Sequence, residues 1–161
     1  MDSMGLFVQA MLNISKNRLF CPIRQKEVVG RPEERIRQGV IDQLLQLGYP
    51  LVYMQIEPLC APRLARRGDL LVMRKSSLGK LYPLFLIECK VGELRKPHFY
   101  QLIGYNHFIQ APYVGLTNGG IWRLYSSWTG SLTMSCPLPY EILCQQVAHF
   151  EAIQKEVNRG D

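Results

Sequence analysis

The pattern of apolar and polar positions divides the chain into alternating helical and extended segments. Apolar residues recur at helical spacing over Pro32–Leu47, Pro97–Ile109 and Pro139–Val157, and each range therefore predicts a helix with one face against a core. Proline at the first position and Gly48 after the last fit the two ends of the first helix. In the third helix, the residues expected to face inward are Ile142, Leu143, Val147 and Phe150.

Shorter apolar runs between these helices predict five strands. They are Tyr49–Glu57, Leu70–Arg74, Tyr82–Cys89, Tyr113–Leu116 and Ile121–Tyr125. Polar or glycine-containing turns at 76–79 and 118–120 interrupt them, and residues 18–29 read as irregular or strand-like. The order of helix, three strands, helix, two strands and helix predicts an α/β sandwich with a mixed central sheet whose first three strands form a meander.

The chain of 161 residues has the size of one domain. We assign this domain to residues 18–161, and it ends in the third predicted helix. Residues 1–17 are expected to form an arm or a short helix. No apolar run approaches the roughly 18 residues needed to cross a bilayer, so we expect a cytoplasmic protein without membrane contact. Five cysteines without CxxC spacing predict buried thiols in a reducing compartment rather than a zinc module or a disulfide framework.

Charged residues at the ends of two predicted strands are the most informative chemical feature. Asp69 precedes one apolar run, and Glu88 and Lys90 end another. Because strand side chains alternate, Glu88 and Lys90 should share one face, with Cys89 on the other. Two carboxylates and a lysine are the parts of a magnesium site that cuts phosphodiesters. Acids at the edge of a buried strand cost free energy unless a cation or another polar group pairs with them. The alternative is a solvated ion pair of little energetic value.

Two of the predicted helices carry further candidates. Glu33 and Glu34 lie in the first turn of the first helix, where acids also suit the positive end of the helix dipole. Gln101 and Tyr105 are four residues apart, so both project from one face of the second helix. Each pair has an ordinary structural explanation. A functional role is indicated by the order in which these pairs and the charged strand-end residues occur along the chain.

Positive charge gathers beside the proposed carboxylates. The net charge is +6, Arg66 and Arg67 come just before the first acid, and Arg95 and Lys96 follow the second. Such side chains can contact phosphates without reading base sequence. We therefore expect a polyanionic partner such as a nucleic acid, with these four residues in contact with it.

Five short motifs follow one another along the chain. They are Arg31-Pro32-Glu33-Glu34-Arg35-Ile36-Arg37-Gln38, Gly68-Asp69, Ile87-Glu88-Cys89-Lys90, Gln101-xxx-Tyr105 and Tyr113-Val114-Gly115-Leu116-Thr117-Asn118-Gly119. In this order they resemble the PD-(D/E)XK nuclease superfamily and, within it, the amino-terminal nuclease domain of type I restriction enzyme restriction subunits. The resemblance covers roughly residues 18–126 and implies a three-layer, restriction-endonuclease-like sandwich with a mixed central sheet flanked by helices. The proline usual before the first aspartate is Gly68 here.

The resemblance also implies a division of labour. Asp69 and Glu88 would bind Mg²⁺ or Mn²⁺ with help from a helix-one glutamate, for which we choose Glu34 and leave Glu33 open. Lys90 would orient or activate the attacking water and steady the charge on phosphate. The implied catalytic residues are Asp69, Glu88, Lys90, Glu34, Gln101 and Tyr105.

From these features we expect a stand-alone, magnesium-dependent nuclease that hydrolyses phosphodiester bonds of DNA. A chain of 161 residues leaves no room for the motor domains of a complete restriction subunit, and no GxxxxGK(S/T) loop for a nucleoside triphosphate is present. Cutting both strands would suit a homodimer. One alternative is an inactive module of the nuclease fold that binds nucleic acid or a protein partner. Another is a small interaction protein whose charged strand ends are incidental.

Overall fold

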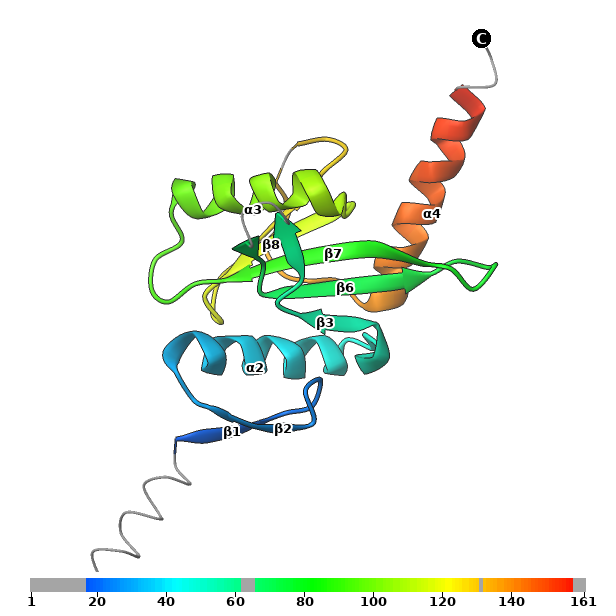
Figure 1. Cartoon of the computed structure of the whole chain (residues 1–161). Helices are drawn as coiled ribbons and strands as arrows, with labels where there is room; N and C mark the ends of the chain where they lie inside the picture. The colour runs from blue at the N-terminus through cyan, green and yellow to red at the C-terminus, as the bar shows by residue number, and fades with distance from the viewer. Residues whose placement is uncertain (1–16, 62–65, 131, 158–161) are drawn as a thin grey trace, which may run out of the picture.

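The computed structural model describes residues 17–61, 66–130 and 132–157, and Figure 1 shows how their elements are arranged. The strands are β1 (Arg18–Cys21), β2 (Lys26–Val29), β3 (Met54–Ile56), β4 (Leu59–Ala61), β5 (Arg66–Arg67), β6 (Leu70–Lys75), β7 (Leu81–Cys89), β8 (Tyr113–Thr117), β9 (Trp122–Ser126) and β10 (Leu132–Met134). The helices are α2 (Pro32–Gln46), the short 3-10 helix η1 (Leu51–Tyr53), α3 (Lys96–Ile109) and α4 (Tyr140–Val157). The arm expected at residues 1–17 lies, apart from its last residue, outside the described residues.

Six strands form one mixed sheet in the order β10-β9-β8-β7-β6-β3. The neighbours β3, β6 and β7 are antiparallel, which is the predicted meander. β7 and β8 are parallel and are connected through α3, whereas β9 and β10 continue in antiparallel fashion. The predicted α/β class with a mixed sheet is confirmed. Both edge strands, β3 and β10, are only three residues long.

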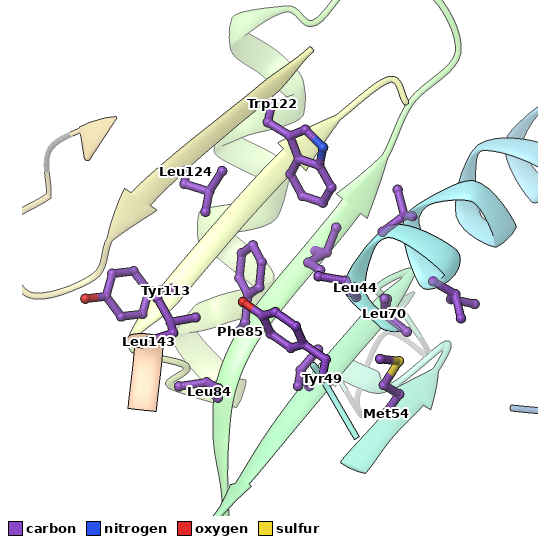
Figure 2. Packing of buried hydrophobic residues seen from close by; sticks show 14 of the residues in the cluster. Leu44, Tyr49, Met54, Leu70, Leu84, Phe85, Tyr113, Trp122, Leu124 and Leu143 are labelled. Carbon is purple, nitrogen blue, oxygen red and sulfur yellow. The ribbon is translucent and has the colours of Figure 1, made fainter. Parts of the chain in front are cut away.

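Helices cover both faces of this sheet (Figure 1). On one face, Ile41 and Leu44 of α2 and Leu143 of α4 belong to a large buried cluster that includes Phe85 and Trp122 (Figure 2). Fully burying a side chain of this size stabilises the fold by about 2 kcal/mol. No helix within the described ranges is long and apolar enough to span a bilayer.

The opposite face of the sheet is covered by α3. Leu102 and Tyr105 of this helix pack with Leu86 of β7 and Val114 of β8 in a second, smaller cluster. Because both clusters meet at the central strands, β7 is apolar on both sides over most of its length. This explains why the run before Glu88 shows no alternation of apolar and polar residues.

Two small hairpins flank the central sheet. The segment at residues 18–29 is the β1–β2 hairpin, which lies on the side of α2 that faces away from the sheet (Figure 1). The second hairpin, β4–β5, was not predicted and lies close to α3. Its strands are three and two residues long, too short to give a periodic sequence pattern.

The predicted strand Tyr49–Glu57 is wrong in its first half. Pro50 cannot donate a backbone hydrogen bond, and its carbonyl instead accepts the N–H of Tyr53 at 2.9 Å to close the 3-10 helix. Only Met54–Ile56 pairs with β6. The aromatic side chain of Tyr49 is nevertheless buried, and its hydroxyl donates to the carbonyl of Leu138 at 2.8 Å.

The inward face of α4 also differs from the prediction. Leu143 and Val147 are buried as expected, but the side chain of Ile142 is 42% exposed. One residue turns a helix by about 100°, so Ile142 lies beside the buried stripe and not within it. Phe150 is half-buried and stacks on Trp128, with 4.0 Å between the ring centroids.

The five thiols have different degrees of burial. Cys21, Cys60 and Cys89 are buried as predicted, and Cys144 is partly buried. The prediction is wrong for Cys136, which is exposed.

Candidate active site

The charges at the strand ends meet at one end of the β6–β7 ladder. Asp69 directly precedes β6, and Glu88 is the penultimate residue of β7. In the antiparallel register Leu70 is opposite Ile87. Asp69 and Glu88 therefore lie opposite each other, one residue further along the two strands. Lys90 comes directly after β7, where its backbone N–H donates to Thr117 of β8 at 2.8 Å. The pairing of the two strands therefore brings together in space two carboxylates that are far apart in the sequence.

Glu88 lies at the centre of this group and is only 4% exposed. Its Oε1 accepts hydrogen bonds from Lys90 Nζ at 2.7 Å and from Gln101 Nε2 at 3.3 Å. Gln101 Nε2 also donates to the hydroxyl of Tyr105 at 2.6 Å, so these two residues of α3 do reach the strand-end site together. The second oxygen, Glu88 Oε2, is buried and accepts no hydrogen bond from a donor among the described residues, although a protonated Glu88 carboxyl could donate to Asp69.

The surroundings of Glu88 make its ionisation costly. Burial, and next the negative charge of Asp69, raise the pKa of Glu88 to about 7, although Lys90 opposes the shift. Burial alone would lower the pKa of Lys90, but its hydrogen bond to Glu88 and the charge of that carboxylate outweigh burial and raise it. Lys90 is therefore a cation at neutral pH, while Glu88 exchanges a proton in that range.

Asp69 is held by two donors. Its Oδ2 accepts the backbone N–H of Cys89 at 2.7 Å, and its Oδ1 accepts a hydrogen bond from the guanidinium of Arg37 in α2. The same guanidinium donates to Glu34 Oε2 at 2.5 Å. Burial would lower the pKa of Arg37, but the hydrogen bond and charge of Asp69, with the charge of Glu34, raise it.

Arg37 was not predicted as a site residue, although the sequence contains a signal for it. Val40, Ile41 and Leu44 form the buried stripe of α2, and Arg37 lies three, four and seven residues before them. It therefore occupies the same stripe and is 7% exposed. A charged residue at a core position of a helix requires a buried counter-charge, and here Asp69 provides it.

Glu34, the chosen third metal ligand, reaches Asp69 only through Arg37. Its Oε1 accepts from Arg24 at 3.1 Å and from Gln38 at 2.7 Å, so both carboxylate oxygens are engaged in hydrogen bonds. Over residues 17–61, 66–130 and 132–157, no group of three or more histidine, cysteine or acidic side chains is placed to hold a metal ion. The structure therefore brings two of the three predicted acids together.

Two other acids lie near this network. Glu57, which sequence reasoning missed, pairs with Arg24 at 3.2 Å and adopts a left-handed backbone conformation with φ of 52°. Such a conformation is uncommon outside glycine and often marks a functional site. Glu33 is exposed, and its negative charge is among those that raise the pKa of Lys90.

Three of the four proposed phosphate contacts, Arg67, Arg95 and Lys96, have exposed side chains. Arg67 is exposed and donates to the carbonyl of Glu57 at 3.1 Å. Arg95 and Lys96 are exposed at the start of α3, the helix that carries Gln101. Arg66 has its backbone in β5, but its side chain lies outside the part of the chain whose side chains are described.

The donor set suits a hard divalent cation such as Mg²⁺. Magnesium is usually held by one or two carboxylates together with water and substrate phosphates, so two acids are sufficient. Glu88 Oε2 is a buried carboxylate oxygen that accepts no hydrogen bond within the described part of the chain, and Asp69 is close enough to raise the pKa of Glu88. These two residues could hold the ion, although Arg37 already pairs with Asp69 and Lys90 already pairs with Glu88.

The fold and the site together define an α/β domain with a carboxylate and lysine site at the ends of its central strands. A family model described as the type I restriction enzyme R protein N terminus matches residues 32–130, which is more than half of the chain. The chain therefore belongs to this family, as its motifs predicted. The match runs from α2 to the turn after β9 and leaves the β1–β2 hairpin and α4 outside. No curated protein and no solved structure matches the chain.

Proposed function

We propose that this domain is a metal-dependent nuclease of the PD-(D/E)XK class that hydrolyses phosphodiester bonds of DNA. The observation that carries the proposal is the convergence of Asp69, Glu88 and Lys90 at one end of the β6–β7 ladder, with Glu88 bonded to Lys90 at 2.7 Å. Membership of a restriction enzyme family supports it. The mixed sheet with helices on both faces agrees with the three-layer sandwich of this class.

Asp69 and Glu88 would hold Mg²⁺ or Mn²⁺. The bound cation would supply Lewis-acid polarisation of the phosphate and would acidify water. Lys90 is protonated in its ion pair with Glu88, so its role is to stabilise negative charge on the phosphate and not to act as a base. Gln101 fixes the orientation of Glu88 through its amide, and Tyr105 in turn holds Gln101.

Exposed cations beside the acids support DNA as the substrate. Arg67, Arg95 and Lys96 would bind backbone phosphates on either side of the carboxylates, with Arg66 as a fourth contact proposed from its sequence position. Contacts of this type position DNA without selecting a base sequence. A homodimer would present two such sites to the two strands of a duplex.

The experiment is cleavage of supercoiled plasmid and single-stranded DNA with Mg²⁺ or Mn²⁺. Glu88→Gln and Lys90→Met should each lower the cleavage rate by about 100-fold or more, because each removes a group that would act on the developing charge. Glu151→Gln is the matched control, since Glu151 also pairs with an arginine but at the other end of β6. Cleavage that survives both Glu88→Gln and Lys90→Met would come from a contaminating enzyme and would refute the proposal.

A non-catalytic DNA-binding module is the second candidate. The observation that favours it is the guanidinium of Arg37, which takes the place beside Asp69 that a metal ion would use. This candidate predicts DNA binding that weakens with salt and is unchanged in Glu88→Gln, with no cleavage under any cation.

A further inference from the structure

Arg37 is the feature of the site that the nuclease proposal does not use. Its guanidinium is buried between Asp69 and Glu34, and it donates hydrogen bonds to both carboxylates. A buried arginine with two acidic partners is often purely structural. This one, however, contacts a carboxylate proposed to hold a metal ion, so it bears directly on cation binding.

We propose that Arg37 is the resident counter-cation of the site and sets the affinity for divalent cations by competing with them for Asp69. The inference rests on the proposed function, because it concerns the same pair of carboxylates. It goes further by assigning a residue outside the expected ligand set to the control of that site. It also makes Glu34 a positioning residue that acts through Arg37, and not a metal ligand.

The first argument is the state of Asp69. Both of its oxygens already accept hydrogen bonds, Oδ2 from Cys89 and Oδ1 from Arg37. A divalent ion on Asp69 must therefore share Oδ1 with the guanidinium or replace it. Sharing would leave two cations within a few ångströms of each other in a buried place, where charge repulsion is weakly screened.

The second argument is that Arg37 has another place to go. Glu34 Oε2 is 2.5 Å from Arg37 Nη1, and Glu57 Oε1 is 3.8 Å from the same nitrogen. These two acids can keep the guanidinium neutralised after it releases Asp69. The Nε of Arg37 is buried without a hydrogen-bond partner among the described residues, so the present arrangement leaves one of its donors unused.

The third argument is the separation of Glu34 from the other acids. Its oxygens are occupied by Arg24, Arg37 and Gln38, and no three-acid cluster forms within the described part of the chain. A glutamate in this position neutralises Arg37 and determines how firmly Arg37 can hold Asp69. The helix-one acid then affects the cation without touching it.

The test is a Mn²⁺ titration without DNA, followed by calorimetry or by the electron paramagnetic resonance of free Mn²⁺. Arg37→Gln should bind Mn²⁺ at least about 5-fold more tightly than the wild type, because the competing charge is gone. Its Tm should be lower without metal and should rise more on addition of Mn²⁺. Arg74→Gln, at the other ion pair of β6, should leave the Mn²⁺ affinity unchanged. An unchanged affinity in Arg37→Gln, or one as weak as in Asp69→Asn, overturns the inference.

A structural measurement covers the case in which Arg37→Gln does not fold. In wild-type crystals soaked with Mn²⁺, Arg37 should leave Asp69 and bind Glu34 and Glu57. Mn²⁺ on Asp69 and Glu88 with the contact between Arg37 and Asp69 unchanged would overturn the inference.

The two proposals fail in different ways. Wild-type protein that binds Mn²⁺ but never cuts DNA refutes the nuclease and leaves the competition by Arg37 standing. Wild-type protein that cuts DNA while Arg37→Gln binds Mn²⁺ no more tightly refutes only the competition. Absence of Mn²⁺ binding in both wild type and Arg37→Gln overturns both.

Discussion

The two ends of the β6–β7 ladder each join the sheet to a helix through an arginine and a carboxylate, but in different surroundings. At one end the side chains of Arg37 and Asp69 are 9% and 12% exposed, and at the other those of Arg74 and Glu151 are 14% and 43% exposed. Partly exposed pairs contribute little to stability, whereas a buried charge that loses its partner is costly. The same pair of functional groups is therefore a partly exposed ion pair at one end and a buried ion pair at the other.

What surrounds each pair makes this difference. Beside Asp69 lies Glu88, a second buried carboxylate with a raised pKa. Beside Arg74 lies the ring of Tyr82, with its centroid 5.3 Å from the guanidinium, in a groove of about 1290 Å³ between α4 and the β6–β7 hairpin. The residues that line this groove include the acid Glu151 but no second carboxylate beside it, in contrast to the pair of acids at the other end of the ladder.

The largest expected effect is on stability. Arg37→Gln should lower the free energy of unfolding by about 3 kcal/mol, because it leaves Asp69 buried beside Glu88 without its counter-charge. Arg74→Gln should lower it by about 1 kcal/mol or less, since its partner Glu151 is partly exposed. Urea unfolding at pH 7 measures both, and equal losses would show that the two pairs do the same work.

The next effect concerns pH. The folded protein binds the Glu88 proton more tightly than the unfolded chain, with a pKa of about 7 against 4.5, so the stabilising contribution of this group is lost as pH rises across that interval. The loss should amount to roughly 3 kcal/mol between pH 4.5 and 7.5, at about 1.4 kcal/mol for each unit of difference in pKa.

Glu88→Gln should remove this pH dependence, and Glu151→Gln should keep it. Urea midpoints measured at four pH values across the interval provide the check. A Glu88→Gln protein with the wild-type slope would mean that Glu88 does not carry the shifted proton.

The smallest effect is on DNA affinity. Arg95→Gln with Lys96→Gln, near the carboxylates, should weaken duplex binding about 10-fold and reduce the salt slope by about two, one for each lost phosphate contact. Lys75→Gln with Lys80→Gln removes two exposed cations at the opposite end and should change the affinity less than about 2-fold. Fluorescence anisotropy with a labelled duplex in a chelating buffer measures both. Equal losses would indicate general charge attraction and no defined DNA path.

The fold was largely predictable because its main elements have strong periodicity. α2 and α3 begin near Pro32 and Pro97, and the spacing of Asp69 and Glu88 follows once Leu70–Lys75 and Leu81–Cys89 form an antiparallel pair. The joint approach of Gln101 and Tyr105 follows from their spacing of one helical turn. These are local or pairwise properties that a sequence pattern records directly.

Most of the rest depended on side-chain placement that no sequence pattern records. Arg37 is the exception, because its position in the buried stripe of its helix follows from its spacing to Val40, Ile41 and Leu44. The ion pairs of Glu34, and the Glu88 oxygen that no donor of the described residues reaches, depend on side-chain placement across different elements. The 3-10 helix after Pro50 has only three residues, too few for a periodic pattern to indicate it.

The short length of the two edge strands affects how readily the main sheet can pair with other polypeptide chains. β3 and β10 offer only three residues each along the borders of the sheet. An incoming polypeptide that tried to extend the sheet would find few free backbone donors and acceptors there. Both edges of the main sheet therefore disfavour fibre growth and edge-to-edge aggregation.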